Sequence, residues 1–444
     1  MPREKSTPLP QPVFNEGNIT PDPKRFKTKH PSDNQQYKAI ETLLDKDAVS
    51  FDQSRAQPSD LYSLATALGP HGPEITQNIL KAGKIVFHCV GDTGASSEGK
   101  YGEEVRVSDQ LTADCQTSRS ADRPAFFFHL GDVVYNFGES KYYYDQFYEP
   151  YRNYPAPIFA IPGNHDSFII PGTAPADAPL AIFMRNFCAT APTITQEAAS
   201  LHRTAMTQPG VYFTLDAPFV RIIGLFSNAL EDPGVISSEN GTWSAVPDYQ
   251  LQFFAAQLQR AKKEKYAGAL LLAMHHPPFC YQPAPKAAGT GGDHASSPNM
   301  LRQIDTVCEA QGLYPHAVLS GHAHNYQRFT RTIQFANKNI QVPFIICGDG
   351  GHDVLKLVQG KNGQAAQEPQ FGLNVEYLEP TKPAVKTQSL ILNHYDDQNF
   401  GYLRITVDDA TLNIAFHQVG QGSTAQSRAD VVSVDLASRT VVVS

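Results

Sequence analysis

Five short apolar runs of the sequence are each followed closely by side chains that bind metal ions. These side chains carry carboxylate, phenol, amide or imidazole groups, and they are Asp92, Asp132, Tyr135, Asn164, His275, His322 and His324. Short apolar runs of this kind are typical of buried strands. Ligands of α/β proteins bind where the carboxyl ends of strands meet. The sequence therefore predicts that these side chains converge on one edge of a sheet.

Each of these pieces also has an ordinary structural explanation when it stands alone. Gly131-Asp132 after a strand makes a common turn, and Asn164 in Gly-Asn-His is a common turn residue. The alternation of His322 and His324 places two imidazoles on one strand face by chance. Five such strand ends in one chain are not independent accidents, so their recurrence favours one shared site.

The predicted ligand set fits two metal ions better than one. Seven oxygen and nitrogen donors without a thiolate exceed a closed tetrahedral zinc site. Asp132 lies in the middle of the set, and a carboxylate can bridge two ions. Two ions about 3.5–4 Å apart can clamp the attacking and departing oxygens of an in-line displacement and activate a bound water. This chemistry is hydrolysis of a phosphoester by a metal-bound hydroxide. His165, beside Asn164, would neutralise the phosphate or protonate the leaving oxygen.

Helices and further strands must hold these strand ends in place. Residues 248–265 predict a helix, because apolar residues recur there at helical spacing and basic residues gather toward its end. Residues 73–82 and 142–151 are also expected to be helical, and 95–123 to hold one crossover helix. Residues 211–226 predict a pair of strands around a turn.

The 444 residues are expected to form one domain behind a polar arm. Residues 1–60 carry several prolines and no sustained period, which indicates a partly disordered arm with one helix near 37–44. Residues 61–444 are expected to be a single domain. Its parts are a motif-bearing core over 84–355, an irregular excursion over 352–395 and C-terminal strands over 401–444.

Composition narrows the expected partners and location. A net charge of −8 offers no basic surface for nucleic acid, and no apolar run is long enough to cross a membrane. The first residues lack the apolar core of a secretory signal. Six cysteines without a CxxC pair indicate buried free thiols. We expect a cytoplasmic protein that acts on a small-molecule phosphoester, and we leave its oligomeric state open.

The ordered motifs Gly-Asp, Gly-Asp, Gly-Asn-His-Asp, His-His and Gly-His-x-His resemble the calcineurin-like metallophosphoesterase family over roughly residues 84–355. The resemblance implies a four-layer α-β-β-α sandwich of two mixed sheets, with a dimetal site on one edge. Two features are similar to the purple acid phosphatase branch of that family. Gly94 stands where the common pattern has a histidine, and Tyr135 stands three residues after Asp132.

The resemblance implies an Fe(III) site and a second, divalent site for Zn, Fe or Mn. The iron would bind Asp92, Asp132, Tyr135 and His324, and the second ion would bind Asp132, Asn164, His275 and His322. The donor chemistry agrees with this division. Anionic oxygens, including a phenolate, suit a trivalent ion, whereas an amide and two imidazoles suit a divalent one.

Four further residues are candidates for contact with substrate. The branch carries a substrate-binding histidine about ten residues beyond the equivalent of His275, but this sequence has Pro285 there. His294, in the glycine-rich stretch 289–297, could close over the site as a catalytic residue or could simply face solvent. The weaker candidates are His276, His352 and Arg328, and the last could instead form a structural ion pair.

The expected reaction is hydrolysis of phosphomonoesters, as in an acid phosphatase. A phosphodiesterase on the same dimetal site is the close alternative, because the same clamp serves both reactions. A non-catalytic binding protein that retains the fold is the alternative of another class. Such a protein is expected to have lost ligands, whereas all seven are present here.

Overall fold

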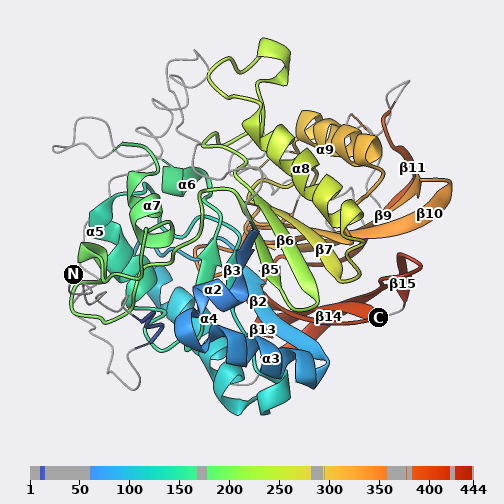
Figure 1. Ribbon diagram of the computed structural model, residues 1–444. Coiled ribbons are helices and arrows are strands. Elements are labelled where there is room, and N and C mark those ends of the chain that lie inside the picture. The colour runs from blue at the N-terminus through green and yellow to red at the C-terminus, as the bar shows by residue number, and fades with distance from the viewer. Residues whose placement is uncertain are drawn as a thin grey trace, which may run out of the picture.

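The protein is a mixed α/β structure built on two mixed β-sheets that lie face to face (Figure 1). This confirms the fold class expected from the sequence. The computed structural model describes residues 11–15, 61–167, 178–281, 294, 296–357, 377, 383–420 and 426–442. The expected helix near 37–44 lies outside these residues. No helix within the described ranges is long and apolar enough to span a bilayer.

The first sheet has eight strands with a parallel block at its centre. Its strands, in spatial order, are β1 (Leu61–Ser63), β5 (Phe213–Ala217), β6 (Val220–Leu225), β7 (Ala269–Met274), β8 (Ala317–Ser320), β10 (Lys338–Cys347), β9 (Tyr326–Phe335) and β11 (Lys386–Asp396). Strands β6, β7, β8 and β10 run parallel, so their carboxyl ends meet at one edge.

The second sheet has seven strands and also contains a parallel block. Its order is β15 (Thr440–Val442), β14 (Gln426–Asp435), β13 (Thr411–Val419), β12 (Phe400–Asp408), β2 (Lys84–Val90), β3 (Phe127–His129) and β4 (Ile158–Ala160). Strands β2, β3 and β4 are the parallel members. The C-terminal strands complete this sheet by pairing antiparallel to β2 through β12.

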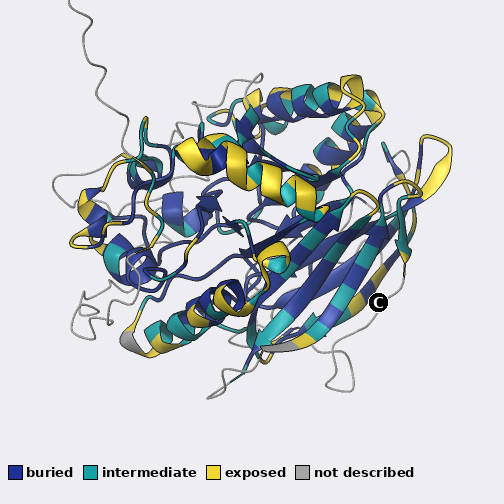
Figure 2. Ribbon diagram, turned by 60° about the horizontal axis from the view of Figure 1, so that its bottom comes forward, coloured by how far each residue is buried: buried dark blue, intermediate teal, exposed yellow. Residues whose placement is uncertain are grey.

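Helices cover the outer faces of both sheets (Figure 1). The helices of the described residues are α2 (Leu64–Ala67), α3 (Gly72–Ala82), α4 (Glu98–Thr117), α5 (Ser140–Tyr143) with the π-helix Tyr144–Tyr148, α6 (Asn164–Ser167), α7 (Ala181–Phe187), α8 (Tyr249–Lys263) and α9 (Pro298–Gln311). Among them, α4 packs on β12 and β13 of the second sheet and α8 on β6 of the first. Short 3₁₀ turns occur at Gly69–His71, Ser120–Asp122, Gln196–Ala198 and Glu239–Gly241. Figure 2 shows buried strands and helices whose outer faces are exposed.

The core lies where the two sheets touch. Phe128 of β3 packs on Phe213 of β5 with ring centroids 6.0 Å apart. Gly224 of β6 has no room for a β-carbon, which would lie 2.7 Å from the Ile161 side chain that follows β4. All six cysteines are buried as free thiols in this interior, as expected. Close packing of this kind fixes the relative position of the two sheets, and with it the positions of the strand ends.

Two elements differ from the sequence expectation. Residues 386–396 were expected to be irregular, but they form β11, which pairs along β9 at the edge of the first sheet. The helix α9 was not expected, although Pro298 begins it and Gly312, at φ 63°, ends it. Proline at a helix start and glycine just past its end are strong boundary signals. Among the described residues of 352–395, those outside β11 belong to no named helix or strand.

Part of the polar arm lies on the domain. The backbone N–H of Val13 donates to the Thr204 hydroxyl at 2.9 Å, and Arg203 donates to the backbone carbonyl of Phe14. The Phe14 side chain packs against the hydrophobic core. Residues 11–15 are therefore ordered against the domain, within an arm whose other residues the structure does not describe.

Candidate metal centre

The predicted ligands follow strands of both sheets, rather than strands of one. Asp92, Asp132 and Asn164 follow β2, β3 and β4 of the second sheet, whereas His275 and His322 follow β7 and β8 of the first. Because the sheets pack face to face with these ends at a common edge, the two sets of side chains oppose each other across the interface. The convergence expected of one sheet is thus produced by two.

Four of the proposed ligands have a left-handed backbone, which non-glycine residues rarely adopt. The φ angles of Asp92, Asp132, His322 and His324 are 57°, 55°, 70° and 45°. Such a conformation costs about 1–3 kcal/mol per residue and persists where surrounding structure imposes it. Here each positive φ turns the chain sharply within a few residues of the end of its strand. Strain concentrated in this way is typical of a functional site.

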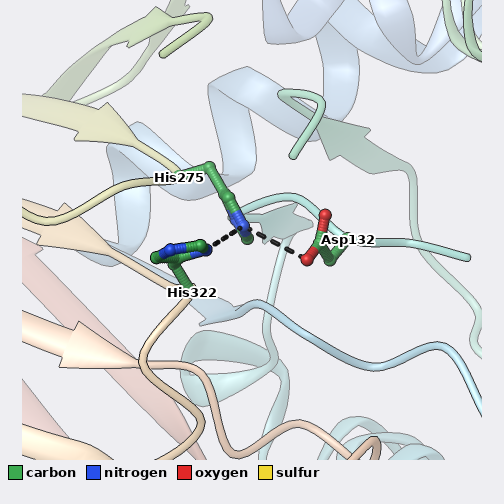
Figure 3. A group of neighbouring side chains, drawn as sticks. All are labelled: Asp132, His275 and His322. Atoms are coloured by element: carbon green, nitrogen blue, oxygen red, sulfur yellow. Dashed lines mark hydrogen bonds and ion pairs between the residues drawn. The ribbon is translucent and has the colours of Figure 1, made fainter. Parts of the chain in front are cut away.

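One group of donors surrounds His275. Figure 3 shows the carboxylate of Asp132 and the ring of His322 on either side of this imidazole. His275 Nε2 lies 3.2 Å from Asp132 Oδ2 and 3.3 Å from His322 Nδ1. The side-chain oxygen of Asn164 lies 3.0 Å from the same Nε2 atom. All four side chains are buried, and their donor atoms face a common point.

A second group surrounds the hydroxyl of Tyr135. This hydroxyl donates to Asp92 Oδ1 at 2.9 Å and lies 3.1 Å from His324 Nε2. The distance between His324 Nε2 and Asp92 Oδ1 is 3.4 Å. Asp132 also interacts with the Tyr135 hydroxyl, so this carboxylate touches both groups of donors.

Burial and neighbouring charges shift the pKa values of the two buried carboxylates in opposite directions. Burial raises the pKa of Asp92 to about 7, and repulsion by Asp132 adds to this against the attraction of His275. Burial lowers the pKa of His275, but the charges of Asp132 and Asp92 outweigh it and raise that pKa to about 9. Burial also disfavours the charge on Asp132, but His275 and His165 hold its pKa below the usual range. A bound cation would satisfy both carboxylates at once.

The residues present fit a pair of metal ions. Asp132 Oδ2 is buried, and His275 Nε2 lies 3.2 Å from it without the geometry of a hydrogen bond. Imidazole, amide, phenol and carboxylate are all ordinary ligands of transition metals. Asp132, His275 and His322 alone place one donor atom each within 4.8 Å of one another. A cation in the space that this buried oxygen faces would stabilise its charge.

His165 lies beside the ligands without belonging to either group. Its backbone N–H donates to Asp132 Oδ1 at 3.0 Å, and its Nδ1 lies 2.8 Å from the Asn136 carbonyl. The imidazole is half-buried and packs on Tyr135 with ring centroids 4.4 Å apart. Because the carbonyl can only accept, Nδ1 carries a proton and the ring orientation is set.

His294 is buried over the centre and does not face solvent. Its Nδ1 lies 3.2 Å from His322 Nε2, and its ring centroid lies 4.9 Å from that of His324. The histidine therefore adjoins both groups of donors. Of the two interpretations that the sequence left open, the solvent-facing one is wrong.

Two of the weaker candidates have structural contacts instead. Both ring nitrogens of His276 are engaged, Nδ1 at 2.8 Å from the Ser227 hydroxyl and Nε2 at 2.7 Å from the Leu230 carbonyl. Arg328 donates to both oxygens of Asp430, at 2.6 and 2.9 Å. Both ring nitrogens of His276 are thus occupied by structural partners, and Arg328 forms the ion pair that the sequence offered as its alternative role.

His352 lies against the ring of Tyr135. The two rings stack with centroids 3.5 Å apart and an interplanar angle of 15°. Its Nδ1 lies 2.8 Å from the Gly94 carbonyl, and its Nε2 lies 3.1 Å from Lys100 Nζ. The Gly94 carbonyl can only accept a hydrogen bond and the Lys100 ammonium can only donate one, so His352 carries a single proton, on Nδ1, and is neutral. Its ring supports that of Tyr135.

Two acidic features near the centre were missed in the sequence. Asp166 accepts backbone N–H groups of Gly163, Val133 and Val134 at 2.9–3.1 Å, and so ties the loops after β3 and β4 together. Glu231 accepts the Asn164 amide N–H at 3.1 Å. The signal for Glu231 was the end of β6, a sixth strand end at the same edge. It was missed because five residues separate it from the strand.

The sequence matches one family of known proteins. A model of the family described as calcineurin-like phosphoesterase matches residues 85–326. No curated protein matches the chain. A solved structure titled "Structure of PhoD" is 12% identical, with a TM-score of 0.46 over 81% of this chain and 71% of that one. GAP50, described as the anchor in the inner membrane complex of Plasmodium, is 10% identical, with a TM-score of 0.47 over 78% and 88%.

Proposed function

The chain belongs to the calcineurin-like phosphoesterase family, and from that premise we propose that it hydrolyses phosphomonoesters at a dimetal centre. The family supports metal-dependent hydrolysis of phosphoesters. The observation that carries the proposal is the position of Asp132, which touches both the His275 group and the Tyr135 group of donors. A carboxylate between two sets of ligands is the arrangement that a pair of bridged ions requires.

The ligands are proposed to divide as the sequence indicated. One ion takes Asp92, Asp132, Tyr135 and His324, and the other takes Asp132, Asn164, His275 and His322. The close contacts within each set support this division. When bound, the two ions supply an activated water and stabilise negative charge on the phosphoester.

The ion beside Tyr135 is proposed to be ferric, as in purple acid phosphatases. A β-carbon at Gly94 would lie 2.7 Å from the Val133 carbonyl oxygen and 2.7 Å from Val134 Cα. A histidine at this position therefore has no room, and the crowding segment is the one that delivers Tyr135. Burial and the nearby carboxylates raise the pKa of Tyr135 well above its usual value. Deprotonation to a phenolate thus calls for a strongly charged cation, which favours a trivalent one.

His165 and His294 are proposed to act on the substrate. His165 is oriented through Nδ1 by the Asn136 carbonyl, so its Nε2 edge can hold the proton that the leaving oxygen takes up. His294 would contact a phosphate oxygen near His322, from a position buried among the site histidines. Both roles use only donors, as an anionic substrate requires.

Hydrolysis of phosphodiesters at the same centre is the second candidate. Glu231 and Asp232 carry carboxylates 3.7 Å from His294 Nδ1 and 4.0 Å from His322 Nε2. Negative charge beside the site disfavours a dianionic monoester more than a monoanionic diester. This observation alone favours the diester, whereas the enclosed centre and two candidate proton donors favour the monoester.

The test compares matched substrates after metal analysis. Purified protein is loaded with iron and zinc or with manganese, and kcat/KM is measured for 4-nitrophenyl phosphate and bis(4-nitrophenyl) phosphate. We expect two ions per chain and the higher kcat/KM on the monoester. A higher value on the diester selects the second candidate. Absence of hydrolysis with either metal loading contradicts both.

The ferric assignment is tested by the visible spectrum. A phenolate bound to Fe(III) gives a charge-transfer band, so the iron-loaded protein should be pink to purple. The band should disappear in Tyr135→Phe. A band that survives this substitution, or a colourless wild type that contains ferric iron, contradicts Tyr135 as a ligand.

A further inference from the structure

The loop that follows β6 is anchored from within by His276. Its ring lies between the Ser227 hydroxyl and the Leu230 carbonyl, at 2.8 and 2.7 Å. The Val235 N–H closes the loop on the Ser227 carbonyl at 2.8 Å. The Gly234 N–H donates to the Ser297 hydroxyl at 2.7 Å. These contacts hold the loop rigidly, and Glu231 is the residue that directly follows Leu230.

Glu231 extends from this loop to two residues of the candidate centre. Its Oε2 accepts the Asn164 Nδ2–H at 3.1 Å, and its Oε1 lies 3.7 Å from His294 Nδ1. The side chain is 23% exposed, so the carboxylate borders the buried centre without being enclosed by it. One carboxylate therefore touches both a proposed metal ligand and a proposed substrate contact.

The contact with Asn164 decides which end of the amide faces the donors. An amide has an oxygen that can bind a metal and an NH₂ group that cannot. The Asn164 oxygen lies 3.0 Å from His275 Nε2, on the side of the other proposed ligands. Its NH₂ group faces Glu231. If the amide were reversed, its oxygen would face a carboxylate and its NH₂ group would face the ion.

We propose that Glu231 is a positioning residue that holds Asn164 in the orientation that binds the second metal ion. This inference rests on the proposed dimetal function. Glu231 acts through Asn164, and no direct contact with an ion or substrate is assigned to it. The role of His276 then becomes clear, because it anchors the loop from which Glu231 extends.

Two variants separate the hydrogen bond from the charge. Glu231→Gln retains an acceptor oxygen of the same reach but removes the charge, whereas Glu231→Leu removes both. Loss of a residue that orients a metal ligand typically weakens metal binding about 10–100-fold. Loss of a partly exposed charge alone changes affinity by up to about 5-fold. Asp232→Asn and Asp232→Leu are the matched controls, since this neighbouring carboxylate is similarly exposed at 27% and lies by His322.

The experiment titrates the metal-depleted full-length protein with Zn²⁺ and follows the heat of binding. We expect two classes of site in the wild type and about 10–100-fold weaker binding at one of them in Glu231→Leu. Binding in Glu231→Gln, Asp232→Asn and Asp232→Leu should stay within about 5-fold of wild type. Thermal unfolding of each metal-free variant checks the fold, and Glu231→Ala, which also removes the acceptor, gives the comparison if Glu231→Leu does not fold.

Three outcomes overturn the inference. Wild-type affinity in Glu231→Leu removes the positioning role. Equal losses in Glu231→Leu and Asp232→Leu, or a loss in Glu231→Gln as large as in Glu231→Leu, assign the effect to charge. If the wild type binds no metal, the proposed dimetal function itself is contradicted. That outcome differs from one in which only the role of Glu231 is wrong.

Discussion

Both halves of the candidate centre have their donor atoms in close contact, but different neighbours support them from outside. Tyr135, in the first half, is stacked on His352 at 3.5 Å and packs on His165 at 4.4 Å, so ring contacts confine it. The second half is a chain of hydrogen-bonding side chains around His275. Its outer members are Asn164 and His294. Both lie next to the carboxylate of Glu231, at the border of the site.

This difference indicates how each half should respond to substitution. A half that is positioned by packing is disturbed when volume is added, because a close-packed interior cannot absorb it. A half that is positioned by hydrogen bonds is disturbed when one partner is removed, because the remaining polar group loses its orientation. Asp132 touches both halves, so its loss should disturb both halves alike.

Asp132→Ala should therefore have the largest effect. We expect both ions to be lost and kcat/KM to fall by at least about 10³-fold, the scale of removing one stabiliser of transition-state charge. Asp92→Ala is the matched comparison and should mainly disturb the ion beside Tyr135. Elemental analysis of both purified variants gives the ions per chain. Two ions in Asp132→Ala would show that this carboxylate does not join the halves.

His165→Ala should lower the rate while leaving both halves loaded. The side chain packs on Tyr135, but the ring of His352, which stacks on the same tyrosine with centroids 3.5 Å apart, is unchanged in this variant. We expect kcat to fall by about 10²–10⁴-fold, the usual contribution of a positioned proton donor. Metal content is measured alongside, and it should equal that of the wild type. Loss of metal, or full activity, would assign His165 to a structural role or to none.

Gly94→Ala should have the smallest effect and should act on the first half alone. Its added β-carbon meets the segment that delivers Tyr135, so we expect a loss of about 1–3 kcal/mol in the free energy of unfolding. Any metal loss should be confined to the ion beside Tyr135. Denaturant unfolding of the metal-free protein measures the change.

Gly99→Ala is the control for this substitution. Gly99 lies near the start of α4, and a β-carbon there meets no atom within 4 Å. Alanine should be tolerated at that position and should stabilise the helix by up to about 1 kcal/mol. Equal stability of the two variants would rule out crowding at Gly94 as the reason for its small side chain.

The sequence by itself determined the ligand-bearing strand ends. Lys84–Val90 and Ala269–Met274 are recognisable because each is a nearly unbroken apolar run, and such runs form buried strands whatever surrounds them. The residue types after them then specified metal chemistry. The sequence also showed Gly94 and Tyr135 as two linked departures from the common motif, and in the fold a β-carbon at Gly94 would meet Val133 and Val134, which directly precede Tyr135.

Only the tertiary structure decided how the surrounding polar residues are used. His276 and His294 are similar as sequence signals, yet His276 anchors a loop and His294 lies over the donors. Glu231 carries no local pattern at all, because its partner Asn164 is 67 residues away in the sequence. Contacts of this kind depend on two sheets packing together and bringing distant loops to one edge. Local sequence patterns report the elements, whereas the pairing of side chains across elements is set by the packed fold.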